Sequence, residues 1–136
     1  MQDLPDKMSL LHAVAKFLGD ERLKKEVRDP GIAFRLKIAA HVVEQVARED
    51  AVEELHDALE LARLEALFDR PVPSLEISRT TRRALIAEHN QVLAERLRAN
   101  DEPAEWIARA HAHLKQTLIE KLSVTTPRFD VAEEIE

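Results

Sequence analysis

The chain has 136 residues, a formal net charge of −6 and no cysteine. The lack of cysteine excludes disulfide scaffolds, thiolate metal sites and thiol nucleophiles, and the acidic total argues against nucleic-acid binding, which needs a basic surface. The start of the chain lacks the basic and apolar regions of a signal peptide, and no apolar stretch approaches the ~20 residues of a membrane helix. We therefore expect a cytoplasmic protein that binds neither nucleic acid nor membrane.

Proline and glycine separate long stretches rich in Ala, Leu, Glu and Arg, a pattern that predicts five amphipathic helices. The first is expected over about residues 7–25, with Asp6 as its N-cap, and the second over 32–48. Asp50 and Glu53 have the spacing of a capping box, which predicts that a third helix begins there and covers 51–68. A proline-rich connection precedes the fourth helix, over 81–99, and the fifth follows over 103–122.

Each predicted helix carries an apolar stripe at helical spacing, and most connections are short. This pattern predicts an all-α, single-domain bundle of about five amphipathic helices with up-and-down topology. The second helix is apolar around more than half of its circumference, as is typical of a central helix. We expect the bundle domain to cover residues 1–130 and residues 131–136 to form an acidic, frayed tail.

Several segments resemble one known family: Asp3-Leu4-Pro5-Asp6, Lys37-Ile38-Ala39-Ala40-His41, Val46-Ala47-Arg48-Glu49, Asn90 with Leu93 and Leu97-Arg98, and Lys121 to Phe129. Over residues 3–130 the chain resembles a bacterial family of domains of unknown function, numbered six two eight five. His41 and Lys37 stand where that family has Asn and Arg, so a role that rests on those side chains is in doubt. The resemblance implies genomic neighbours that encode aminoglycoside-phosphotransferase-like kinases and acyl-CoA dehydrogenases.

The first candidate site is the polar stripe of the second predicted helix. At 100° per residue, its members lie within about 100° of one another; they are Lys37, His41, Glu44, Gln45 and Arg48. One interpretation is the solvated edge of a central helix with i,i+4 contacts. The other is the polar wall of a ligand pocket between helices.

Lys121 falls inside the apolar stripe of the fifth predicted helix. It can extend outward from the last turn, where a cation is favoured, or form a buried ion pair. A catalytic lysine would need a partner that the sequence does not supply. His89 and Arg96 lie on the inward side of the fourth helix, which predicts a hydrogen-bonded core histidine or a subunit contact.

Arg79, Arg82 and Arg83 place three cations at a helix N-terminus, where the dipole disfavours them. An anion such as a phosphate bound there would relieve this repulsion, and a solvated loop is the alternative. His111 and His113 point away from each other on a helix, and the single Glu53-x-x-His56 pattern lacks the second copy that a di-iron bundle needs. We expect no metal and no cofactor.

No complete catalytic constellation is present in the sequence, so we do not expect an enzyme. The expected function is that of a non-catalytic accessory or interaction protein for a kinase-like or acyl-CoA dehydrogenase-like partner encoded nearby. The alternative is a helical bundle that binds an acyl or phosphorylated metabolite. A homo-oligomer is compatible with both.

Overall fold

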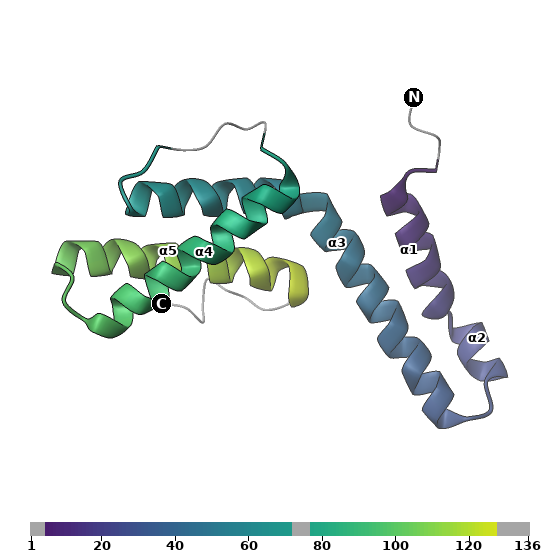
Figure 1. Ribbon diagram of the computed structural model, residues 1–136. Helices are drawn as coiled ribbons and strands as arrows, with labels where there is room; N and C mark the ends of the chain where they lie inside the picture. The colour runs from purple at the N-terminus through teal and green to yellow at the C-terminus, as the bar shows by residue number, and fades with distance from the viewer. Residues whose placement is uncertain (1–4, 72–76, 128–136) are drawn as a thin grey trace. The chain divides into compact units, whose positions relative to one another are not determined.

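The computed structural model describes residues 5–71 and 77–127. These residues form helices joined by turns, with no strand among them, which confirms the all-α class (Figure 1). Four helices have twelve residues or more, and a fifth is a short helix of six. In chain order they are α1 (Lys7–Leu18), α2 (Glu21–Glu26), α3 (Pro30–Leu67), α4 (Arg79–Ala99) and α5 (Ala104–Thr125).

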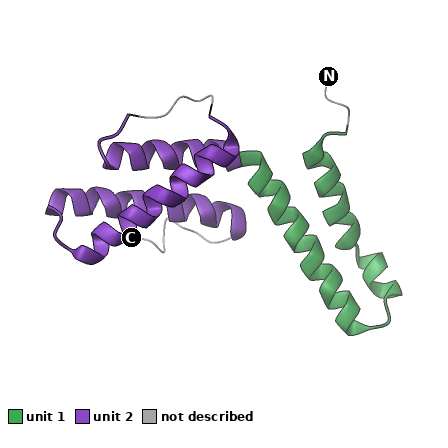
Figure 2. Ribbon diagram, viewed as in Figure 1, with its two compact units in different colours: residues 1–52 green, residues 53–136 purple. Residues whose placement is uncertain are grey.

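The chain divides into two compact units, Met1–Val52 and Glu53–Glu136 (Figure 2). Unit 1 contains α1, α2 and the first part of α3, and unit 2 contains the rest of α3 with α4 and α5. The expectation of a single domain over residues 1–130 stays a prediction. The predicted tail, residues 131–136, lies outside the described part of the chain.

Unit 1 is built on a helical hairpin of α1 and the first part of α3 (Figure 1). The two helices are antiparallel, because Lys7 at the start of α1 forms an ion pair with Asp50, whereas Gly19 at its end lies beside Ala40. Asp6 accepts a hydrogen bond from the backbone N–H of Ser9 at 2.7 Å and so caps α1 as predicted. Ala15 and Ala47 are the buried apolar residues of this unit.

The predicted first helix, over 7–25, is divided in two. Gly19 caps the end of α1, and Asp20 begins α2 by accepting hydrogen bonds from the backbone N–H groups of Arg22 and Leu23 at 2.6 and 3.4 Å. Because an aspartate with extended backbone is a strong N-cap, the Gly-Asp pair acts as a boundary that the apolar periodicity did not reveal.

The second and third predicted helices are one continuous helix, α3, so the boundary predicted at Asp50 is wrong. The capping-box pattern requires the Asp50 carboxylate to bind backbone N–H groups at a helix start. In the structure that carboxylate pairs with Lys7 instead. No Gly or Pro occurs between residues 32 and 67, so nothing in the sequence obliges the helix to stop.

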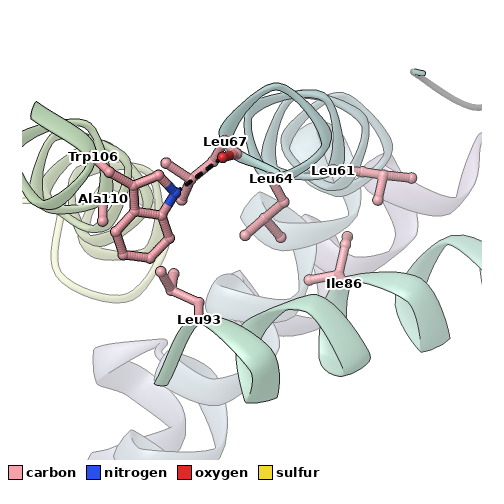
Figure 3. Close-up of a cluster of buried hydrophobic side chains, with 7 residues drawn as sticks. All are labelled: Leu61, Leu64, Leu67, Ile86, Leu93, Trp106 and Ala110. Carbon is pink, nitrogen blue, oxygen red and sulfur yellow. Dashed lines mark hydrogen bonds between the residues drawn. The ribbon is translucent and has the colours of Figure 1, made fainter. Parts of the chain in front are cut away.

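Unit 2 packs the second part of α3, α4 and α5 around one hydrophobic cluster (Figure 3). Its seven buried members are Leu61, Leu64, Leu67, Ile86, Leu93, Trp106 and Ala110. The indole N–H of Trp106 donates to the carbonyl oxygen of Leu67 at 3.1 Å, so the ring is buried without an unpaired donor. This bond joins the start of α5 to the end of α3.

Within unit 2, α4 runs in the same direction as the second part of α3 (Figure 1). Residues at the start of α4 pair with Glu53 and Asp57, and Asn90, further along α4, pairs with Glu60. α5 then returns antiparallel to both helices. Both α1 and α5 are therefore antiparallel to the part of α3 that they pack against, as expected of an up-and-down bundle. By contrast, α4 is parallel to the second part of α3.

Candidate functional site

The polar stripe predicted on residues 37–48 lies on the first part of α3 in unit 1. Glu44 is its structural centre, because its carboxylate contacts the His12 ring Nδ1 at 3.2 Å and the Arg48 guanidinium at 4.0 Å. Lys37 and His41 are exposed. The structure thus joins Glu44 to a residue of α1 and to Arg48, and the choice between a solvated edge and a pocket wall stays a prediction.

Lys121 is exposed near the end of α5, as expected for a lysine that extends outward from the last turn. It belongs to unit 2, whereas the stripe belongs to unit 1. Its positive charge is one of the smaller causes that lower the pKa of the buried His113 on the same helix.

Acidic side chains of α3 meet the arginine triplet at the N-terminus of α4. Arg79 and Arg83 both contact the carboxylate of Glu53, and the Arg83 Nε also donates to Asp57 at 3.0 Å. Arg82 is buried, with its guanidinium 3.9 Å from the carboxylate of Glu54. A bound anion would have to compete with these carboxylates. It would bind at the predicted site only if its interaction with the arginines were stronger than theirs.

His89 is a buried, hydrogen-bonded histidine, as one of its two interpretations predicted. Its Nε2 lies 2.9 Å from a carboxylate oxygen of Glu65, which is buried as well. The ring also meets Phe68 edge-on, with the centroids 5.7 Å apart. Arg96 stacks over Trp106, its guanidinium carbon 4.3 Å from the ring centroid, and pairs with Glu102. The contacts of both residues therefore lie within unit 2.

The sequence did not reveal a polar layer between α3 and α5. Arg63 forms a bidentate pair with Glu120, with N–O distances of 2.9 and 2.7 Å, and its Nη2 also lies 3.4 Å from the Thr117 hydroxyl. Gln116 donates to the same carboxylate at 3.1 Å. A signal was present, because residues 106, 110, 113, 117 and 124 share the inward face of α5 and two of them are polar.

His113 is the least satisfied member of this layer. Its side chain is 5% exposed, and neither ring nitrogen has a hydrogen-bond partner among the described residues. Burial, and then the positive charge of Arg63, hold the pKa of His113 below its ordinary value of 6.5. The ring is therefore neutral at pH 7, with one donor and one acceptor turned toward the interior.

Glu120 on the same layer stays ionised. Burial alone would raise the pKa of its carboxyl, but hydrogen bonds from Arg63 and Gln116 outweigh burial, so the pKa lies below 4.5. At neutral pH the layer thus contains an ion pair beside a neutral imidazole that has no hydrogen-bond partner among residues 5–71 and 77–127. Buried groups with displaced pKa values are found at binding sites and also in structural ion-pair networks.

Residues 5–71 and 77–127 contain no group of three His, Asp or Glu side chains arranged to hold a metal ion. In the same part of the chain no helix is long and apolar enough to cross a membrane.

A family described as a domain of unknown function, DUF6285, matches residues 26–129. No curated protein and no solved structure matches the chain.

Proposed function

This chain belongs to the DUF6285 family of domains of unknown function. We propose that it is a non-catalytic accessory protein that binds another protein through unit 2. The partner we propose is a kinase-like or acyl-CoA dehydrogenase-like enzyme encoded beside it in a bacterial genome, and the complex would be cytoplasmic. The resemblance to a family whose members are often encoded beside such enzymes supports this choice of partner.

One observation carries the proposal. Unit 2 leaves two pairs of leucines exposed, and none of the four belongs to its buried hydrophobic cluster. Each pair has the i,i+4 spacing that brings side chains together on a helix surface: Leu55 and Leu59 on α3, and Leu114 and Leu118 on α5, with exposed fractions between 41% and 60%. Solvated leucine pairs that the core does not need are the anchors that a helical partner surface uses.

The test is co-expression of the chain with each neighbouring gene product, followed by affinity purification and light scattering. We expect a stoichiometric complex with one neighbour. Changing Leu114 and Leu118 together to Glu should weaken it by roughly 30-fold or more, since central apolar anchors carry most of an interface's free energy.

The matched control is the double change of Ala108 and Ala112 to Glu, which adds the same charge to exposed positions of the same helix. Its complex should keep its affinity, and both variants should keep their helical circular dichroism. Purification of the chain without any neighbour, or equal loss in both variants, would overturn the proposal.

A second candidate function is the binding of an acyl or phosphorylated metabolite, and His113 is the observation that favours it. A buried imidazole with two unpartnered nitrogens beside Arg63 could bind a polar group that enters the layer. A ligand that binds only the folded state raises the unfolding midpoint. We expect a thermal shift with acyl-CoA or a nucleotide, reduced in a His113→Leu variant; no shift with either compound would count against this function.

A further inference from the structure

The hairpin of unit 1 has two different faces. The contact between His12 and Glu44 places these two residues on one face. On an α-helix, a residue two positions away points about 200° from its neighbour. Leu10 and Val14 flank His12 in this way, and Val42 and Val46 flank Glu44, so these four side chains lie on the opposite face.

This second face is apolar and exposed. We call it the apolar hairpin face, and its members are Leu10, Val14 and Phe17 of α1 with Ile38, Val42 and Val46 of α3. Their exposed fractions run from 46% to 64%. The exposed parts of these six side chains offer on the order of 500 Å² of apolar surface, which approaches the ~800 Å² per partner of a stable interface and reaches the largest patches that typical monomers expose.

The charges that border this face are complementary to those of a second copy. Arg35, Val42 and Glu49 follow one another at intervals of seven residues, so they lie on one line along α3. Arg35 and Glu49 are exposed, and neither has an ion-pair partner within residues 5–71 and 77–127. A two-fold axis at Val42 places Arg35 of each copy opposite Glu49 of the other and sets Ile38 against Val46.

We propose that two copies of this chain associate through the apolar hairpin face, with their α3 helices antiparallel about Val42. The two hairpins together form a four-helix bundle, in which each copy covers the apolar side that a single hairpin leaves exposed. A two-fold interface uses the same surface on both copies, and the charges on this surface are complementary to those of a second copy. The proposal concerns unit 1 and does not depend on the proposed function of unit 2.

The test is the mass of the purified full chain by light scattering over a concentration series. We expect twice the chain mass of 15.5 kDa. Val42→Glu places two carboxylates against each other at the axis and should raise the dissociation constant at least ~100-fold. His41→Glu adds the same charge at the adjacent position, away from the face, and should leave the dimer unchanged.

A charge exchange tests the antiparallel arrangement. Arg35→Glu should weaken the dimer by roughly tenfold or more, because like charges then face each other at both ends. The double variant R35E with E49R should restore the original dissociation constant. A monomer at all concentrations, a dimer that ignores Val42→Glu, or a double variant no tighter than the single one would overturn the proposal; a monomer would mean that this face is covered in some other way. Circular dichroism confirms that each variant is folded.

Discussion

Replacement of His113 by leucine should stabilise the protein. The wild-type ring buries one donor and one acceptor without hydrogen-bond partners among the described residues, and each such group costs about 1–3 kcal/mol. Leucine has similar bulk and no polar atom, and a swap of nearly equal volume costs less than about 1.5 kcal/mol. The two groups together cost at least about 2 kcal/mol, so after the swap cost the expected net gain is at least about 0.5 kcal/mol, or roughly 2 °C or more in the unfolding midpoint of a chain of this size.

The assay is urea unfolding at pH 7.5, followed by far-ultraviolet circular dichroism, with His111→Leu as the control. His111 is exposed on the same helix, so its replacement should change the unfolding free energy by less than about 0.5 kcal/mol. If His113→Leu were less stable than wild type by more than about 1 kcal/mol, the reasoning would be refuted, because the ring nitrogens would then have to be satisfied in the folded protein.

The His113→Leu variant also allows a test of how stability depends on pH. The folded pKa of His113 lies below 6.5, for reasons of burial and of the Arg63 charge. Below pH 6.5 the unfolded ring therefore binds a proton that the folded ring does not, so the wild type loses stability as pH falls, until the folded pKa is passed. Glu60 and Glu120 face the ring and reduce this effect, whereas Lys121 adds to it. The advantage of His113→Leu should grow between pH 7.5 and pH 5.

Three further changes test unit 2 by the same urea assay. Trp106→Phe removes the donor to the Leu67 carbonyl and should cost about 1–3 kcal/mol; an unchanged midpoint would contradict the burial of that bond. Glu120→Gln removes the charge that pairs with Arg63 and should cost about 1–2 kcal/mol at pH 7; because the folded pKa of Glu120 is lowered, this cost should shrink as pH falls below 4.5. Asn100 has a φ of 54°, so Asn100→Val should lower the unfolding free energy by about 1–2 kcal/mol, whereas Asn100→Gly should lower it by almost nothing. Equal losses of stability in the two variants would exclude backbone strain as the cause.

The predicted bounds of α4 and α5 are close to those in the structure. The fourth predicted helix begins two residues later than α4, and the fifth ends three residues earlier than α5. Ser78 caps the start of α4 through the Thr81 N–H, and Asn100 ends this helix with left-handed backbone. Such signals act within one turn of helix, and so they can be read from the sequence.

The errors arose where a side chain had a choice between local and distant partners. Asp50 fits a helix cap by its spacing, yet it pairs with Lys7, which is more than forty residues away in the sequence. In the sequence, Arg79 and Arg83 are cations at a helix N-terminus, where the dipole disfavours them. In the structure, both form ion pairs with Glu53 of another helix. Spacing shows which groups a residue can reach along its own helix, whereas these partners depend on how helices pair.

The candidate site shows the same division. The inward position of His89 follows from helical periodicity, and its burial confirms it. His113 has the same periodicity, but its significance depends on what faces it across the layer, namely Arg63 and the carboxylates around it. Periodicity predicts that a histidine is buried, and only the packed structure shows whether its nitrogens find partners.

Trp106 has a consequence for spectroscopy. It is the only tryptophan of a chain without tyrosine, and it lies in the core of unit 2 with Arg96 stacked on its indole ring. Intrinsic fluorescence excited at the indole band therefore reports on unit 2 alone, while the hairpin of unit 1 contributes only to the helical signal. Emission and ellipticity recorded along one melting curve would coincide if the two units unfold as one and separate if they do not, without any label added to the protein.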